Sequence, residues 1–314
     1  MPEPEELQAH LSQRYGIRVQ AMLTLDQDVT LLRRSDGPNW VARVFSAERS
    51  PAAAAGDAEI LRWLATTGFP AERCAHEEPV SVLDGRAVLV TEAVRSVPLA
   101  QRRKTLKDAG GLRRLGGLLA ALSKLDPPSG AARRSGGAWH HATDGTPAAE
   151  LALVGEWLEE AEAEASARDL GVYSSLQDEL DLVDDGQGLP EAFVHPDFVL
   201  ANVVATPEPG MVVVDWAGAG VGPRLWPLAF LLWAEGAKDP RRAALVLSGY
   251  RSEVQLTPEE VDRLAAMMRA RPLIFGIWHL RQRNKAAAVV LAEARETQRL
   301  AEMLAQRVKE RIEE

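Results

Sequence analysis

Four polar residues in one short stretch of the chain have the types and the order that phosphoryl transfer requires. His195, Asp197 and Asn202 follow a short apolar pair, and Asp215 follows a run of three valines. An Asp can orient a hydroxyl group and accept its proton, while an Asn and a second Asp can hold Mg²⁺ against phosphates. Carboxylate and amide oxygens suit Mg²⁺ because it is a hard cation. The stretch therefore predicts transfer of a phosphoryl group to a hydroxyl.

The residues between these positions predict a β-hairpin. Asn202 leads into a short valine-containing strand, and the sequence at 206–210 has turn chemistry, since proline fixes φ and glycine permits a positive φ. The run before Asp215 is then the returning strand. Asp197, Asn202 and Asp215 would meet at one end of this hairpin. The alternative for each residue taken alone is a turn cap or a strand end.

This pattern resembles the catalytic motif of the aminoglycoside phosphotransferase family, small-molecule kinases with a protein-kinase-like fold. The family motif is usually His-Gly-Asp-x-x-x-x-Asn, followed by Asp-Trp or Asp-Phe. It is matched here by His195, Asp197, Asn202, Asp215 and Trp216. The resemblance implies that Asp197 is the catalytic base and that Asn202 and Asp215 are the Mg²⁺ ligands. It assigns His195 to the catalytic loop, which we expect this residue to organise by hydrogen bonding.

The order of predicted elements favours an α+β fold with two lobes, because strands come first and helices afterwards. We expect helices at 5–15 and 52–66, strands at 19–23, 29–32 and 40–45, and a hairpin at 80–90. Residues 1–94 would form a nucleotide-binding lobe, a small antiparallel β-sheet with one helix. Residues 95–314 would form a larger, mostly helical lobe that carries the catalytic loop and binds the substrate.

The resemblance also places nucleotide-binding residues in the first lobe. Arg43 lies on the third strand, where kinases place a basic residue over the α- and β-phosphates, and Glu59 on the next helix is its expected acidic partner. Thr91, Glu92 and Val94 would belong to the hinge, whose backbone groups bind the edges of adenine. The alternatives are a surface charge for Arg43 and an exposed helix residue for Glu59. The expected cofactors are Mg²⁺ and ATP, with GTP as the alternative nucleotide.

Three features depart from the family pattern. The phosphate-covering loop, expected at 24–29, has no glycine and contains Asp26 and Asp28, whose carboxylates would repel phosphates if they turned inward. Pro196 replaces the motif glycine and has no backbone N–H. Pro227 stands where the family usually has an Asp that accepts N–H bonds from the catalytic loop. Because a donor and its acceptor are lost together, we expect a repacked but functional loop.

The composition limits the class of protein. A chain of 314 residues and 34.2 kDa suffices for one large domain or two lobes. Cys74 is the only cysteine, which excludes a disulfide framework within the chain and fits a reducing cytosol. We find no signal peptide and no long apolar span, so we expect a cytoplasmic protein without a membrane partner. The net charge of −9 argues against non-specific binding to nucleic acids.

Acidic residues are concentrated in one segment of the chain. Residues 141–190 contain thirteen Asp and Glu residues but a single basic residue, Arg168. Two interpretations stay open: solvated helix faces, or a negative wall that attracts a cationic substrate.

Together these features predict an ATP- and Mg²⁺-dependent phosphotransferase that acts on an alcohol group of a small molecule. An antibiotic or related natural product such as an aminoglycoside is the first expectation, with a role in antibiotic resistance. A nucleoside or an amino alcohol is a competing substrate. The alternative function is a non-catalytic, nucleotide-binding pseudokinase or regulatory module, which the glycine-free loop and the two prolines suggest. The sequence leaves the oligomeric state open.

Overall fold

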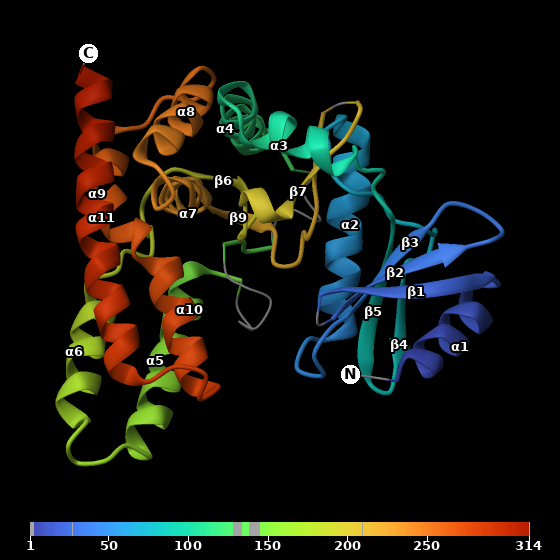
Figure 1. The fold of residues 1–314 in the computed structure, drawn as a ribbon, viewed down its shortest axis with the longest axis horizontal. Coiled ribbons are helices and arrows are strands. Elements are labelled where there is room, and N and C mark those ends of the chain that lie inside the picture. Colours follow the sequence, from blue (N-terminus) through green and yellow to red (C-terminus); the bar gives the residue numbers. More distant parts are fainter. Residues whose placement is uncertain (1–2, 27, 128–133, 138–144, 209, 314) are drawn as a thin grey trace. The chain divides into compact units, whose positions relative to one another are not determined.

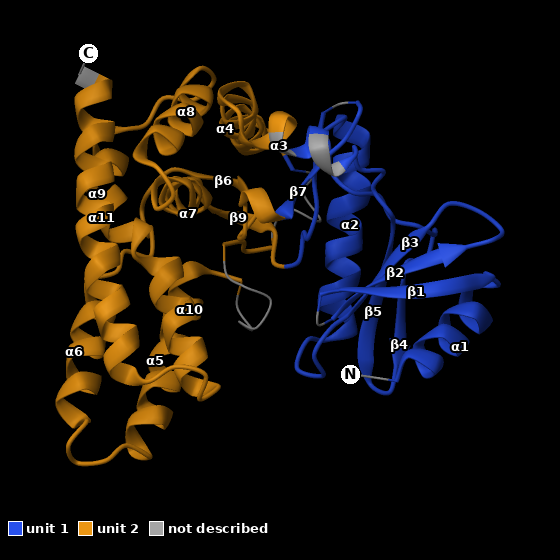
Figure 2. Ribbon diagram, viewed as in Figure 1, with its two compact units in different colours: residues 1–102, 127–131, 202–217 blue, residues 103–126, 132–201, 218–314 orange. Residues whose placement is uncertain are grey.

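The structure, a computed structural model, describes residues 3–26, 28–127, 134–137, 145–208 and 210–313. It divides into two compact units (Figures 1 and 2). Unit 1 comprises residues 1–102, 127–131 and 202–217, and unit 2 comprises residues 103–126, 132–201 and 218–314. An antiparallel sheet in the N-terminal part and mostly helical structure afterwards confirm the predicted α+β fold class. The lobe boundary after residue 94 stays a prediction.

Unit 1 is built on a five-stranded antiparallel sheet. Its strands are β1 (Val19–Asp26), β2 (Val29–Arg34), β3 (Trp40–Val44), β4 (Val80–Leu83) and β5 (Arg86–Glu92), in the order β1-β2-β3-β5-β4. The unit also contains α1 (Pro4–Tyr15), α2 (Pro51–Thr67) and the hairpin of β7 (Val203–Ala205) and β8 (Met211–Val213). Both helices begin with proline and end at a left-handed glycine, Gly16 or Gly68. These elements confirm the predicted helices, strands and hairpins of this part.

Alternate residues of the central strands serve the two faces of the sheet. Leu32, Ala42 and Val90 belong to an apolar core that includes Leu7 and Leu11 of α1. The neighbouring positions line a pocket: Leu31, Val41, Arg43, Leu89 and Thr91. This two-residue period follows from strand geometry, in which successive side chains point to opposite faces. The same strands therefore supply both the core and a site.

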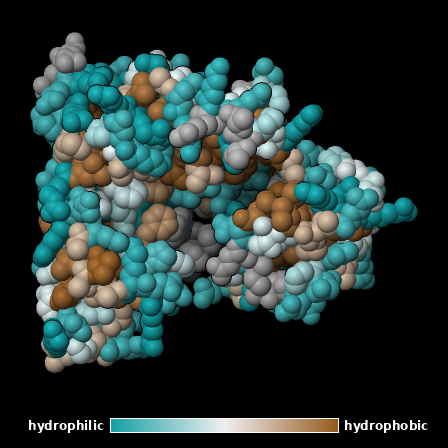
Figure 3. Space-filling model, viewed as in Figure 1, coloured by the Kyte–Doolittle hydropathy of each residue, from teal (hydrophilic) through white to brown (hydrophobic). Residues whose placement is uncertain are grey.

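Unit 2 is mostly helical. Its elements are α4 (Ala109–Ser123), α5 (Pro147–Ala163), α6 (Leu170–Asp181), β6 (Glu191–Val194), β9 (Gly220–Pro223), α7 (Leu225–Gly236), α8 (Pro240–Arg251), α9 (Pro258–Met268), α10 (Ala270–Arg281) and α11 (Ala287–Glu313); α3 (Leu99–Lys107) spans the border of the units. β6 and β9 form an antiparallel pair. Figure 3 shows hydrophilic residues over much of the visible surface, with hydrophobic residues gathered in smaller areas. In the part of the chain that the structure describes, no helix is long and apolar enough to cross a membrane.

Two glycines allow α4 and α8 to pack backbone against backbone. A Cβ atom on Gly116 would lie 1.9 Å from the carbonyl oxygen of Val246, and one on Gly249 would lie 1.9 Å from that of Arg113. Real Cβ atoms do not approach so closely, so neither position accepts a side chain. A Cβ atom on Gly117 would lie 3.8 Å from the nearest carbonyl oxygen, which is an ordinary contact.

Arginines from the C-terminal part of the chain form ion pairs with five residues of the acidic segment. The ion pairs are Arg263–Asp184, Arg269–Glu179, Arg271–Glu150, Arg281–Glu160 and Arg283–Glu164. The pairs of Arg269 and Arg271 are buried, and those of Arg281 and Arg283 are exposed. Five of the thirteen acidic residues of the segment are therefore paired with arginines, and its role toward a substrate stays a prediction. Of its acidic residues, Asp144 lies outside the described part of the chain.

Candidate active site

A pocket of about 350 Å³ in unit 1 gathers most of the predicted nucleotide-binding residues. Arg43, Thr91, Glu92, Val94 and Asp215 all line it, among apolar side chains from the sheet and α2. A largely apolar pocket with a few convergent polar groups is typical of a small-molecule site, for which volumes of roughly 300–1,000 Å³ are usual.

Asp215 has a left-handed backbone conformation at one end of the β7–β8 hairpin. Its φ is 69°, which residues other than glycine seldom adopt. Its N–H donates to Oε1 of Glu72 at 2.7 Å, and the N–H of Val214 donates to the carbonyl of Asn202 at 2.9 Å. The hairpin thus brings Asn202 and Asp215 to the same end, as the turn chemistry predicted. Trp216, the residue after Asp215, is fixed in turn, because its indole N–H donates to a carbonyl within the hairpin.

Arg43 pairs with Asp215 and not with Glu59. Its Nη2 lies 2.9 Å from Oδ2 of Asp215. Glu59 is exposed on α2, so the predicted Arg43–Glu59 pair is wrong. Asp57 of the same helix is buried, lines the pocket and forms an ion pair with Arg49. Positions two apart on a helix point in nearly opposite directions, so only one of these two acids can turn toward the pocket.

Glu72 is a site residue that the sequence analysis missed. Its two carboxylate oxygens accept hydrogen bonds from the N–H of Asp215 at 2.7 Å and from the hydroxyl of Thr91 at 2.9 Å. Burial raises the pKa of Glu72 above its ordinary value, while these two bonds and the charge of Arg43 act to lower it. Glu72 and Asp215 are 143 residues apart in the sequence, so no spacing pattern could have joined them.

The backbone around Glu72 joins the hairpin to the hinge strand. The N–H of Glu72 donates to the carbonyl of Val213 at 3.0 Å, two residues before Asp215. The carbonyl of Arg73, the residue after Glu72, accepts the N–H of Glu92 at 2.8 Å. The N–H of Ala93 donates to the carbonyl of Asn39, also at 2.8 Å. Two hinge N–H groups are therefore already engaged, and an adenine edge would be recognised by other groups of this segment.

The expected phosphate-covering loop, at 24–29, falls at the connection of β1 and β2. β1 and β2 stay paired as far as Asp26 and Val29, so two residues separate the strands. One of them, Gln27, lies outside the described residues. Asp26 is exposed and Asp28 is half-buried.

In unit 2, the loop after β6 carries His195 and Asp197. His195 is fully buried, and its ring packs edge-on against Phe198 with 5.9 Å between the ring centroids. Its Nδ1 lies 3.1 Å from the backbone N of Asp197 and accepts the N–H, which requires an unprotonated Nδ1. The carbonyl of Asp197 accepts the N–H of Val199 at 2.9 Å. These bonds shape the loop, in which Asp197 as a whole is half-buried.

The loop is bonded through the backbone carbonyl of Pro196, and the effect of Pro196 and Pro227 on its function stays a prediction. The carbonyl of Pro196 accepts a hydrogen bond from Nη2 of Arg271 at 3.0 Å. Arg271 lies on α10, is buried and pairs with Glu150 of α5 at 2.7 Å. Pro227 lies in the first turn of α7, where backbone N–H groups have no partner within the helix, so its missing donor costs little.

The donor set of unit 1 fits a hard cation that is shared with phosphates. Within the described residues, no group of three or more His, Cys, Asp and Glu side chains could hold a metal ion by itself. Mg²⁺ is usually bound through one or two carboxylates together with substrate phosphates rather than in an all-protein cage. Asp215, with Asn202 at the same hairpin end, supplies oxygen donors of this kind.

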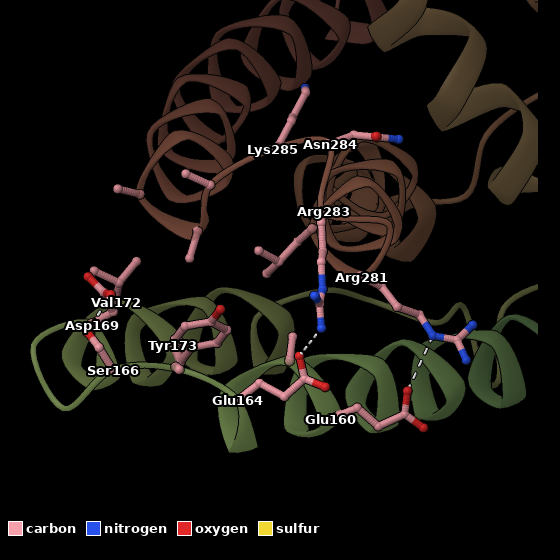
Figure 4. A pocket seen from close by; sticks show the side chains of 16 residues that line it. Glu160, Glu164, Ser166, Asp169, Val172, Tyr173, Arg281, Arg283, Asn284 and Lys285 are labelled. Atoms are coloured by element: carbon pink, nitrogen blue, oxygen red, sulfur yellow. Dashed lines mark hydrogen bonds and ion pairs between the residues drawn. The ribbon is translucent and has the colours of Figure 1, made fainter.

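A second pocket, of about 850 Å³, lies in unit 2 between the α5–α6 pair and the link from α10 to α11 (Figure 4). The ion pairs Arg281–Glu160 and Arg283–Glu164 cross it. Exposed pairs of this kind contribute little to stability. Its lining contains none of the predicted site residues, so we place the candidate nucleotide site in the pocket of unit 1.

Comparisons with known proteins agree with this fold. A model described as the phosphotransferase enzyme family matches residues 24–264. An aminoglycoside phosphotransferase structure from Alicyclobacillus acidocaldarius is 16% identical, with a TM-score of 0.60 over 96% of this chain and 95% of that chain. A spectinomycin phosphotransferase in complex with ADP and spectinomycin is 12% identical, with a TM-score of 0.64 over 98% of this chain and 100% of that chain. A choline kinase from Streptococcus pneumoniae is 14% identical, with a TM-score of 0.63 over 94% of this chain and 98% of that chain. At these identities the structures show the fold alone, and a search of curated proteins found no significant match.

Proposed function

The chain belongs to the phosphotransferase enzyme family, and we propose that it uses ATP and Mg²⁺ to phosphorylate a hydroxyl group of a small molecule. The observation that carries this proposal is the end of the β7–β8 hairpin. There Asp215 lines the pocket in a fixed left-handed conformation, Asn202 lies at the same hairpin end, and Arg43 is in contact with the Asp215 carboxylate. Oxygen donors beside a guanidinium suit a metal–phosphate group.

Each motif residue has a role in this proposal. Asp197 orients the acceptor hydroxyl and takes its proton, and His195 holds the loop through the N–H of Asp197. Asn202 and Asp215 hold Mg²⁺, which when bound offsets the negative charge of the phosphates. Arg43 exchanges its Asp215 partner for phosphate oxygens, because its planar fork matches either anion. Positioning and electrostatics then supply most of the rate, and no covalent intermediate is needed.

The proposed nucleotide lies in the pocket of unit 1. Apolar side chains such as Leu31, Val41 and Leu89 would contact the flat faces of the base, and the segment of Thr91, Glu92 and Val94 would contact its edge. ATP is the proposed donor, and GTP is the competitor that a binding assay separates from it.

The proposed acceptor is an antibiotic or related natural product with a free hydroxyl, such as an aminoglycoside. Two of the similar structures are named as aminoglycoside and spectinomycin phosphotransferases, and a choline kinase extends the class to amino alcohols. The acidic segment gives weaker support for a cationic acceptor, because arginines pair with five of its carboxylates. A role in antibiotic resistance and a cytoplasmic location belong to the same proposal.

The test is detection of a phosphorylated product by intact mass. Wild-type protein and Asp197→Ala are incubated with Mg-ATP and a panel of aminoglycosides, other hydroxylated antibiotics, nucleosides and amino alcohols. A product that forms only with the wild type supports the proposal and identifies the substrate class. Thermal unfolding is followed in parallel, since a ligand at a hundred times its Kd stabilises a protein by about 2.7 kcal/mol. Stabilisation by Mg-ATP with no product would favour the non-catalytic alternative, and no stabilisation would refute the nucleotide site.

A further inference from the structure

We infer that Arg271 and Glu150 form a positioning pair that fixes the catalytic loop through the backbone carbonyl of Pro196. This inference rests on the proposed function, because it concerns the loop that carries the proposed base, Asp197. All four residues belong to unit 2.

The guanidinium of Arg271 joins three segments of the chain. Its Nη1 donates to Oε1 of Glu150 on α5 at 2.7 Å. Its Nη2 donates to the carbonyl of Gly137 at 2.8 Å and to that of Pro196 at 3.0 Å. The side chain of Arg271 is 1% exposed, and its guanidinium carbon lies 5.8 Å from the ring centroid of Trp226.

The bond to Pro196 acts on the peptide group that directly precedes Asp197. The carbonyl of Pro196 and the N–H of Asp197 belong to one planar peptide unit. Arg271 binds its oxygen at 3.0 Å, and Nδ1 of His195 binds its N–H at 3.1 Å. With both polar atoms of this unit held, the plane from which the Asp197 side chain projects cannot rotate freely.

Proline at position 196 explains why the holding group is a donor. Pro196 has no N–H, so an acidic side chain could not hold this residue through its backbone nitrogen. Its carbonyl remains, and a buried carbonyl needs a donor. Arg271 supplies a charged donor, which forms stronger and more directional hydrogen bonds than a neutral one.

A gain in stability does not explain why this ion pair is buried. Burying two charges costs more free energy than burying an apolar pair of the same volume. Apolar replacements of buried ion pairs are therefore often neutral or stabilising. The gain from Arg271 and Glu150 is therefore a fixed geometry at Pro196 and Gly137.

A second buried ion pair offers a matched control. Arg269, two residues earlier, pairs with Glu179 of α6, and both side chains are buried. The side-chain hydrogen bonds of Arg269 go to the carboxylate and the carbonyl of Glu179. Within the described residues, this pair resembles that of Arg271 in chemistry and burial but lacks a bond to the catalytic loop.

The experiment compares two double variants. Arg271→Met/Glu150→Leu removes the positioning pair, and Arg269→Met/Glu179→Leu removes the control pair. Removing both partners avoids leaving an uncompensated buried charge, which would be strongly destabilising. The first readout is hydrogen exchange at the amide of Asp197, measured without nucleotide or substrate. The second is the pair of constants kcat and KM for the nucleotide.

We expect exchange at Asp197 to be about tenfold faster in the positioning variant, because one charge-assisted hydrogen bond no longer restrains the peptide unit. We expect kcat to fall by roughly 10–100-fold, since a displacement of about 1 Å at a reacting group can cost a factor of about 100. KM for the nucleotide should change less than about twofold, because the pocket in unit 1 is untouched. The control variant should match the wild type in exchange at Asp197, in kcat and in KM.

Equal behaviour of the two double variants, or wild-type exchange at Asp197 in the positioning variant, would overturn the inference. If the positioning variant does not fold, Arg271→Lys replaces it, since an ammonium keeps the charge beside Glu150 but lacks the fork that reaches two carbonyls. Wild-type exchange at Asp197 in that variant would overturn the inference equally. Absence of turnover in the wild type would refute the proposed function alone, while the exchange measurement would still decide the role of Arg271.

Discussion

Replacing Glu72 with alanine should lower both the affinity for Mg-ATP and the free energy of unfolding of unit 1. The carboxylate accepts the N–H of Asp215 at 2.7 Å and the hydroxyl of Thr91 at 2.9 Å. Asp215 has a φ of 69°. A residue with a side chain pays about 1–2 kcal/mol for this conformation. Without the Glu72 acceptor, the Arg43 ion pair still holds the side chain of Asp215, but its backbone N–H is released and the left-handed conformation should relax.

The magnitude follows from these bonds. A hydrogen bond to a charged group contributes about 1.5–3 kcal/mol to stability. Part of this loss is offset, because alanine has no carboxylate to bury. Burial of the Glu72 carboxylate is unfavourable, as its raised pKa indicates. We expect the free energy of unfolding to fall by about 1–2 kcal/mol. Restoring the left-handed conformation of Asp215 on binding costs a similar amount, so the affinity for Mg-ATP should fall about tenfold, since 1.4 kcal/mol is one factor of ten.

Calorimetric titration with Mg-ATP and denaturant unfolding measure the two effects. Glu72→Gln is the informative comparison, because its amide oxygen can still accept the N–H of Asp215, and we expect it to lose less affinity than Glu72→Ala. Glu78→Gln is the control, since Glu78 is an exposed carboxylate paired with Arg14. The reasoning would be refuted if Glu72→Ala bound Mg-ATP as tightly as the wild type.

Two further predictions concern packing and reactivity. Gly116→Ala should destabilise unit 2 by about 1–3 kcal/mol, because its Cβ would lie 1.9 Å from the carbonyl oxygen of Val246. Gly117→Ala should be neutral or stabilising by up to about 1 kcal/mol, and urea unfolding of both variants would reveal any failure of this contrast. Burial raises the pKa of Cys74 to about 11, and its thiol donates to the carbonyl of Ala58 at 3.6 Å. At pH 8 the thiol is therefore protonated, and its alkylation by iodoacetamide should be roughly 100-fold slower than in the urea-unfolded chain; similar rates would contradict the prediction.

Local physical chemistry accounts for the parts of the structure that the sequence predicted. Turn residues and alternating apolar positions were enough for the sheet strands and for the hairpin that brings Asn202 and Asp215 to one end. The start of α9 depends on equally local contacts, because Thr257 and Glu260 form a capping box within four residues. Interactions of this kind join residues that are close in sequence, so they can be predicted from the sequence pattern and the residue spacing.

Which acidic residue of α2 faces the pocket depends on the packing of the helix. The sequence analysis named Glu59 as the acidic residue of this helix, but the buried face of the helix includes Asp57 and leaves Glu59 in solvent. Arg43 then takes Asp215 as its partner across a large sequence separation. Helix propensity does not specify which face is buried, because that is decided by the surface against which the helix packs.

Tertiary structure alone determined the groups that hold the two functional segments in place. Glu72 binds the N–H of Asp215 across 143 residues, and Arg271 binds the carbonyl of Pro196 across 75 residues. Neither contact leaves a pattern in the sequence, because a hydrogen bond between distant residues exists only once the intervening chain has packed. The sequence itself determined which residue types could transfer a phosphoryl group, whereas the packed fold determined which backbone atoms are held still around Asp197 and Asp215.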